Sequence, residues 1–183
     1  MHKFRQFTLL LLYLLRKRSR DPLRPVVSRF WVSPFDVELF RAVSHAYVAF
    51  AGLGRWDWSF HNINWSGLLR EKWAPLTHTE LVHYRRAAKL FSMIEVTTTL
   101  VWWDEKMMYM EHRITQNGKL SAIIHARGTF FAGKERISPN RCILGLMPTP
   151  STVKPEIVDL WEKTDNFLKQ ADTLPAGKLP AAA

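Results

Sequence analysis

The stretch that decides the fold is Trp102–Phe131, which reads WWDEKMMYMEHRITQNGKLSAIIHARGTFF. Apolar and polar residues alternate on both sides of Asn117-Gly118, the dipeptide that most strongly favours a two-residue type I′ turn. Alternation with a period of two predicts strands with one buried face, so we expect an antiparallel hairpin here. The faces expected to be buried carry Met108, Met110, His112 and Ile114 on the first strand, and Leu120, Ala122, Ile124, Ala126, Gly128 and Phe130 on the second.

The segments before this hairpin predict more strands and one long helix. Leu39–Phe60 contains no proline and places apolar residues at helical spacing, with Gly52 and Gly54 among them. These small residues suit a helix that lies close against a sheet. A shorter amphipathic helix is predicted at Glu156–Lys169. Further strands are predicted, from their β-branched and aromatic content and their alternation, at Ser28–Ser33, Ala74–Tyr84 and Phe91–Trp103. One helix against an antiparallel meander is an α+β layout.

The length and composition of the chain predict one globular domain, and its net positive charge predicts a partner that carries phosphate. The chain has 183 residues, of which 47% are hydrophobic and 23% charged, and its formal net charge is +10. A basic chain attracts nucleic acid, anionic lipid or coenzyme A. Much of the excess belongs to the first thirty residues, which disfavours nucleic acid as a partner of the folded body. These cations are Lys3, Arg5, Arg16, Lys17, Arg18, Arg20, Arg24 and Arg29.

The N-terminal segment combines a short apolar run with flanking cations. Phe7–Leu15 reads FTLLLLYLL, about half the length that a helix needs to cross a bilayer. We interpret residues 1–24 as a helix at an anionic membrane surface followed by a linker. A signal peptide or a terminal helix packed on the domain are the alternatives. The expected organisation is then a domain over residues 25–170 and a disordered tail over 171–183, in a cytoplasmic protein held peripherally at a membrane.

Two blocks resemble the hot-dog-fold acyl-CoA thioesterases, in the branch that begins with a short hydrophobic segment. Ser33–Arg55, SPFDVELFRAVSHAYVAFAGLGR, is similar to that branch's P-x-D-x-D-x-N-x-H-x-N-N-x-x-Y followed by D-L-G-R. Trp102–Phe131 is similar to its G-W-D-E-K-x-x-Y-x-E followed by a hairpin strand. A proline-rich stretch before Val158–Trp161 extends the resemblance to about residue 165.

The resemblance implies a hot-dog fold, in which a curled antiparallel sheet wraps around a central helix. It further implies a homodimer or a dimer of dimers, with the acyl-CoA substrate at the dimer interface near the start of the helix. The family's catalytic aspartate is the second acidic residue of D-x-D, which falls on Glu38, with Asp36 as the first.

The position of these two carboxylates suits thioester hydrolysis. The reaction needs a carboxylate that attacks the carbonyl or activates water, and donors that stabilise the oxyanion. Asp36 and Glu38 lie before the predicted helix, whose first N–H groups are free to donate. The alternative is that the two acidic residues only complement the helix dipole.

The sequence departs from the family pattern at the start of the helix. The family histidine falls on Ala42, and the Asn-Asn pair falls on Ser44 and His45. His45 is the candidate to replace the histidine, or else a residue of the helix surface. Tyr47 is either the family tyrosine or a core residue, and we count Ser44 and Tyr47 as candidates for substrate binding.

A basic loop and four scattered histidines complete the candidate residues. Arg85, Arg86 and Lys89 form a basic loop that is expected to meet coenzyme A phosphates, or else to be a solvated turn. Metal ligands need tight spacing, so we expect neither a metal nor another cofactor. The histidines without such spacing are His78, His83, His112 and His125.

Two functions from different classes follow. The first is an acyl-CoA thioesterase that hydrolyses a fatty-acyl or related thioester. The second is a catalytically inactive hot-dog protein that binds acyl chains or protein partners, because the family histidine and asparagines are lost. A weaker third interpretation is a basic binder of nucleic acid or lipid surfaces.

Overall fold

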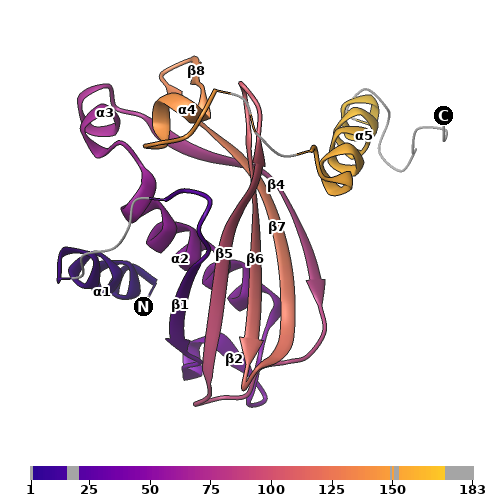
Figure 1. The fold of residues 1–183 in the computed structure, drawn as a ribbon. Coiled ribbons are helices and arrows are strands. Elements are labelled where there is room, and N and C mark those ends of the chain that lie inside the picture. Colours follow the sequence, from indigo (N-terminus) through magenta and orange to yellow (C-terminus); the bar gives the residue numbers. More distant parts are fainter. Residues whose placement is uncertain (1, 16–20, 149, 151–152, 172–183) are drawn as a thin grey trace. The chain divides into compact units, whose positions relative to one another are not determined.

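The sheet and helices of the chain are shown in Figure 1, a computed structural model that describes residues 2–15, 21–148, 150 and 153–171. Residues 1–150 form one compact unit and residues 151–183 a second. The helices of the first unit are α1 (His2–Leu15), the 3-10 turn η1 (Pro34–Asp36), α2 (Ser44–Asn62), α3 (Trp65–Arg70) and α4 (Pro139–Cys142). Its strands are β1 (Val26–Trp31), β2 (Val37–Glu38), β3 (Arg41–Ala42), β4 (Ala74–Tyr84), β5 (Met93–Trp103), β6 (Met108–Gln116), β7 (Lys119–Ala132) and β8 (Glu135–Ile137).

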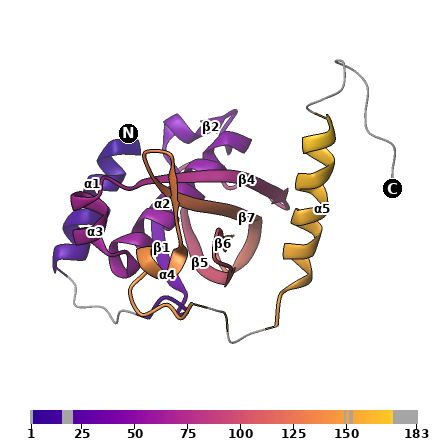
Figure 2. The same cartoon turned by 90° about the horizontal axis from the view of Figure 1, so that it is seen from above.

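The main sheet is antiparallel and strongly curled. Its strands follow the order β1-β5-β6-β7-β4, and β8 pairs with β7 beside this path. Figure 2 shows β5, β6 and β7 bending around α2, which lies on the concave side of the sheet. The expected layout of one central helix held by a curled antiparallel sheet is therefore confirmed.

The hairpin between β6 and β7 forms as its sequence predicts. Asn117 and Gly118 both have positive φ, 50° and 70°, as a type I′ turn requires. The register then pairs Glu111 with His125 on one face and His112 with Ile124 on the other. The predicted alternation of burial holds around His112–Ile114 and Ala122–Ala126. It fails at Leu120 and Gly128, which are only partly buried, and at Tyr109, Ser121 and Thr129, which are buried on the opposite face.

The core lies between the concave face of the sheet and α2. Gly54 permits the close approach, because a Cβ there would lie 2.6 Å from Thr98 Oγ1 and 2.7 Å from Val96 Cγ1. The prediction of small residues facing the sheet thus holds at Gly54, whereas Gly52 has open space beside it. Central members of the core are Tyr47, Phe50, Leu53, Ile94, Val96, Ile114 and Ile124.

The predicted start of the long helix at Leu39 is wrong. Residues 37–42 instead form the small hairpin β2–β3, in which Val37 pairs with Ala42. The turn residues Leu39 and Phe40 have φ of 47° and 66°, which the right-handed helix excludes. The helix begins only at Ser44, after Val43 as its N-cap.

The N-terminal helix α1 belongs to the same unit as the sheet. Leu9 is buried, and Arg5 is only partly exposed, whereas Phe4, Phe7 and Leu11 are exposed. No helix in the described part of the chain is both long enough and apolar enough to cross a membrane. The basic run at residues 16–20 and most of the predicted disordered tail lie outside the described residues.

The second unit contains α5 (Glu156–Ala171), which confirms the predicted C-terminal helix. Lys154 precedes it and forms ion pairs with Asp159 and Glu162, both at 2.8 Å. These pairs join the segment before the helix to its first two turns.

Candidate active site

The loop between β1 and the β2–β3 hairpin is held by its own side chains. Ser33 precedes the turn η1, and its backbone N–H and its Oγ both donate to Asp36 Oδ2, at 2.8 and 2.6 Å. Pro34 occupies the first position of the turn, where a missing N–H costs nothing. This local motif fixes Asp36 with its carboxylate turned back over the loop.

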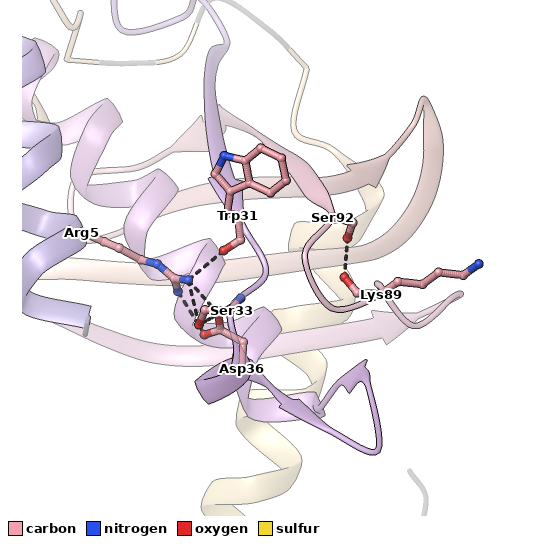
Figure 3. Close-up of polar contacts among 6 residues, drawn as sticks. All are labelled: Arg5, Trp31, Ser33, Asp36, Lys89 and Ser92. Carbon is pink, nitrogen blue, oxygen red and sulfur yellow. Dashed lines mark hydrogen bonds and ion pairs between the residues drawn. The ribbon is translucent and has the colours of Figure 1, made fainter.

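Asp36 is also clamped by Arg5 from the N-terminal helix (Figure 3). The guanidinium donates from Nη1 to Oδ1 at 3.0 Å and from Nη2 to Oδ2 at 2.7 Å. Burial of Asp36 is the largest single effect on its pKa and raises it, but the hydrogen bonds from Arg5 and Ser33 together outweigh burial, so the pKa of Asp36 is lowered. Asp36 is therefore an ionised, fully engaged carboxylate.

The same loop is tied to the start of α2 through its backbone. Val43, the N-cap residue of α2, donates its N–H to the carbonyl oxygen of Asp36 at 3.2 Å. The Val43 carbonyl then accepts the first helical bond, from Ala46 at 3.1 Å. Ser44 and His45 lie in this first turn with exposed side chains, and N–H groups at such positions have no acceptor within the helix.

Glu38, the other candidate carboxylate, lies in a different environment from Asp36. It ends β2 and is exposed, next to Leu39 and Phe40, which are 92% and 75% exposed. The two acidic residues that the sequence suggested as a pair thus lie in different environments. Glu38 is open to a ligand, whereas Asp36 is held in a network.

Two tyrosines connect α2 to the segment after β4. Tyr47 is buried; its hydroxyl donates to the Arg86 carbonyl at 2.9 Å and accepts from the Ala88 N–H at 2.7 Å. Burial raises the pKa of Tyr47. Tyr84 donates its hydroxyl to the Ser44 carbonyl at 3.3 Å. Tyr47 therefore acts as a strut for residues 86–88 instead of presenting its hydroxyl to solvent.

A basic hollow lies between this segment and the β6–β7 turn. Arg86 and Lys89 of the predicted basic loop line it, whereas Arg85 is exposed outside the lining. Hollows with an excess of one charge concentrate ions of the opposite charge. The cations of the lining are Arg41, Arg86, Lys89 and Lys119, and its other members are Ala87, Gln116, Asn117 and Ser121.

The remaining candidate groups are inert or scattered. Burial raises the pKa of the Cys142 thiol to about 12, so the thiol is protonated at neutral pH. His112 is fully buried, its Nδ1 lies 3.0 Å from Thr98 Oγ1, and burial lowers its pKa well below the ordinary value. Within the part of the chain that the structure describes, no three His, Cys, Asp or Glu residues are arranged to hold a metal ion.

Sequence reasoning missed Arg5 and, among the cations of the basic lining, Arg41 and Lys119; Arg86 and Lys89 were expected as parts of one basic loop. Arg5 counted only as one of many N-terminal cations, and its partner lies 31 positions away. Arg41 and Lys119 come from two other segments, far from Arg86 and Lys89 in the sequence. No spacing signal in the sequence brings such residues together, because their proximity depends on the tertiary fold.

Comparison with known protein families gives a match over most of the chain. A family model described as the thioesterase-like superfamily matches residues 32–170. No curated protein sequence matches the chain significantly.

Several solved structures share the fold at low sequence identity. The YbaW probable thioesterase of Escherichia coli is 16% identical, with a TM-score of 0.56 over 61% of this chain and 88% of its own. The hypothetical protein SAV2348 of Staphylococcus aureus, solved in complex with CoA, is 12% identical, with a TM-score of 0.56 over 77% and 96%. The 1,4-dihydroxy-2-naphthoyl-CoA thioesterase Slr0204 of Synechocystis is 12% identical, with a TM-score of 0.50 over 63% and 88%. The likeness to thioesterases of known structure confirms the hot-dog fold.

Proposed function

This chain belongs to the thioesterase-like superfamily, and on that premise we propose that it hydrolyses an acyl-CoA thioester with Glu38 as the reacting carboxylate. The observation that carries the proposal is the placement of Glu38. It is an exposed carboxylate on the hairpin that leads directly into α2, and the loop before it is hydrogen-bonded to Val43, the N-cap residue of that helix.

The proposed chemistry uses the start of α2 as the oxyanion site. In one route Glu38 takes a proton from water as the water adds to the thioester carbonyl carbon, the C–S bond breaks, and the proton leaves with the thiol. In the other route Glu38 attacks the carbonyl carbon and the thiolate leaves, and water then hydrolyses the acyl–Glu38 anhydride to the free acid and the Glu38 carboxylate. The N–H groups of Ser44 and His45 stabilise the negative oxygen. The His45 side chain assists from the same turn, and Asp36 assists by holding the loop.

The basic hollow supports coenzyme A as the carrier of the acyl group. Its cations suit the phosphates of coenzyme A, and a structural neighbour of this chain was solved with CoA bound. In this proposal Arg86 binds phosphate, and Arg85 does so from the rim. Ser44 lines the acyl end, and Tyr47 contributes by holding residues 86–88 in place.

We further infer that the active form is a homodimer or a dimer of dimers. The strand β4 ends the main sheet at one side, and its side chains are mostly exposed. An exposed edge of this length invites pairing with another chain.

The N-terminal segment supports a peripheral position at a membrane. Phe4, Phe7 and Leu11 recur at helical spacing and are exposed, next to a run of cations in the sequence. We infer that a cytoplasmic protein rests this face on an anionic bilayer. Sedimentation of the full chain with vesicles that contain phosphatidylserine tests the inference, and equal recovery with neutral vesicles would contradict it.

A second candidate function is binding without hydrolysis. Ala42, where the family has histidine, is buried, and its N–H donates to the Ala88 carbonyl at 2.8 Å. It therefore offers no group to a substrate. In this alternative the fold binds acyl chains or protein partners, and Glu38 is only a surface residue.

Thiol release from short- to long-chain acyl-CoAs separates the two candidates. We expect the full chain to turn over at least one of them and Glu38→Gln to lose that activity by about a hundredfold or more. Glu105→Gln removes another exposed carboxylate and is the matched control. Full activity in Glu38→Gln would exclude our assignment of the carboxylate. Tight acyl-CoA binding without turnover in the wild type would establish the alternative.

A further inference from the structure

We propose that Arg5 of the N-terminal helix is a positioning residue of the site, which orders the loop of Asp36 and, through it, the Glu38 hairpin and the start of α2. That Glu38 is the group positioned by Arg5 rests on the proposed function. The chain of contacts from Arg5 to the start of α2 is independent of that function, so an experiment can contradict one without the other.

The Asp36 carboxylate is engaged by four hydrogen bonds, three of them to Oδ2. Its Oδ2 accepts hydrogen bonds from Arg5 Nη2, from the Ser33 N–H and from Ser33 Oγ, and its Oδ1 accepts one from Arg5 Nη1. Two carboxylate oxygens offer about four acceptor sites. Asp36 is also only 7% exposed. Its role is therefore to join three pieces of chain.

Arg5 is held as firmly as its partner. Beyond the two bonds to Asp36, Nη2 donates to the Trp31 carbonyl at 2.8 Å, at the end of β1 (Figure 3). Its guanidinium lies over the ring of Phe50, 5.1 Å from the centroid, and Phe50 is a fully buried residue of α2. One turn further along α1, Leu9 is buried too. Arg5 thus connects β1, the loop and α2.

The path from Asp36 to the reacting groups is short. Its carbonyl oxygen accepts from Val43, which caps α2, and the next residue, Val37, pairs with Ala42 across the hairpin. Glu38 follows directly. Without the guanidinium, the loop of Asp36 is less firmly held. Both the hydrogen bond from Val43 to Asp36 and the Val37–Ala42 pair start from this loop. The distance between Glu38 and the N–H groups of α2 then varies, and such misplacement lowers the rate of the chemical step more than it weakens binding.

Side-chain geometry makes a specific demand on residue 5. A guanidinium offers two parallel N–H groups to a carboxylate and a further one to the Trp31 carbonyl, whereas an ammonium is a point charge. Arg5→Lys should therefore keep the positive charge but hold the loop of Asp36 less firmly than arginine does. Arg5→Met keeps the length of the side chain and removes both the charge and the donors.

The test measures kcat and KM of the full chain and of its variants on the best acyl-CoA. We expect Arg5→Met to lower kcat by about tenfold to a hundredfold with KM within about threefold, and Arg5→Lys to lie between it and the wild type. Arg29→Met, which removes the exposed ion pair with Glu95, is the matched control and should keep wild-type kinetics.

Two further readouts distinguish positioning from a general loss of stability. The acid limb of the pH–activity profile should move to higher pH in Arg5→Met, because Asp36 loses the bonds that lower its pKa. The double variant Arg5→Met/Asp36→Asn should lose less activity than the sum of the two single losses, expressed as free energies, because both substitutions break the same hydrogen-bond network.

Hydrogen exchange at the backbone N–H groups of residues 37–46 decides the physical link even without enzymatic activity. We expect faster exchange there in Arg5→Met than in the wild type, with the β5–β7 amides unchanged. A wild type without turnover would remove the proposed function and leave this measurement valid. Unchanged kcat together with unchanged exchange would overturn the role of Arg5. A rise of kcat would overturn it as well, since Arg5 would then block a catalytic Asp36.

Discussion

At the scale of single residues, the environment of a carboxylate decides its role more than its place in the sequence does. Asp36 and Glu38 are two positions apart, yet one is buried under an arginine and the other is exposed. A carboxylate with saturated hydrogen bonds is an anchor. A carboxylate in solvent beside a helix start is available to a substrate.

A third carboxylate, Glu111, gives a pH-dependent prediction. His125 Nε2 donates to it at 3.1 Å and Arg113 Nε at 2.7 Å. The bond from His125 is the largest effect; it and Arg113 outweigh burial and lower the pKa of Glu111 to about 2 from an ordinary 4.5. A depressed pKa stabilises the fold above the unfolded value, and this stabilisation is lost as the pH falls from about 4.5 to about 2.

We therefore expect Glu111→Gln to lower the free energy of unfolding at pH 7 and to flatten its fall between pH 4.5 and pH 2. Urea unfolding at a series of pH values measures both effects. Glu105→Gln, at an exposed position, should reproduce the wild-type curve. A Glu111→Gln protein with the wild-type slope would contradict the assignment.

Some residues of the candidate site were predictable from the sequence and some were not. The region of Asp36, Glu38, Ser44 and His45 could be nominated as a candidate site, because a family pattern and the start of a helix coincide there. The different environments of the two carboxylates could not be predicted, since the burial and hydrogen bonding of Asp36 depend on Arg5. A residue on another helix, 31 positions away, leaves no local signal.

At the scale of elements, the β2–β3 hairpin is the unusual piece of the structure. Leu39 and Phe40 both have positive φ, which costs most residues other than glycine about 1–2 kcal/mol each. Both side chains are exposed as well. A strained, apolar turn beside the proposed carboxylate fits a segment that contacts a ligand or a partner chain, since strain of this kind is concentrated at functional sites.

The contact between α2 and the sheet gives the prediction for this scale. Gly54→Ala should destabilise the protein by about 1–3 kcal/mol, because the new Cβ would meet Thr98 and Val96 at less than contact distance. Gly52→Ala is the matched control, since nothing lies near that position. We expect it to be neutral or stabilising by about 0.5–1 kcal/mol, from helix propensity alone. Denaturant unfolding compares the two, and equal effects would contradict the close approach.

Long elements were predictable and short ones were not. The period-two alternation in the middle of β6 and β7 and the Asn-Gly turn hold because local propensity and burial agree there. The helices α3 and α4 and the strand β8 have only three to six residues, too few for periodicity to show. The start of α2 was predicted too early for a similar reason. Leu39 and Val43 fit a helical pattern, but the short β2–β3 hairpin turns the backbone between them.

At the scale of the whole molecule, the curled sheet leaves β4 as an edge. Leu76, Leu81 and Tyr84 on this strand are each about half exposed. The proposed dimer would cover this edge and add the strands of a second copy to the sheet. The mass of the protein in solution is therefore the first property to measure.

We expect sedimentation equilibrium to give a dimer, or a multiple of it, for the wild type. Leu81→Lys should shift the protein toward the monomer, because it adds a charge to the edge that pairs. Leu69→Lys changes an equally apolar but more exposed residue on α3 and should leave the mass unchanged. A monomeric wild type would remove the dimer from the proposal, and loss of the dimer in both variants would point to another surface.

The register that pairs β1 with β5 has a consequence for the order of folding. Val26 lies opposite Thr98, so the first strand of the sheet to leave the ribosome has no partner until some seventy residues later. The meander β5–β6–β7 closes through short turns, whereas joining β1 to it closes a long loop, and such contacts form late. The Arg5 clamp needs the loop that follows β1. We therefore expect the β5–β7 meander to form before β1 joins it, and the Arg5 clamp to form last.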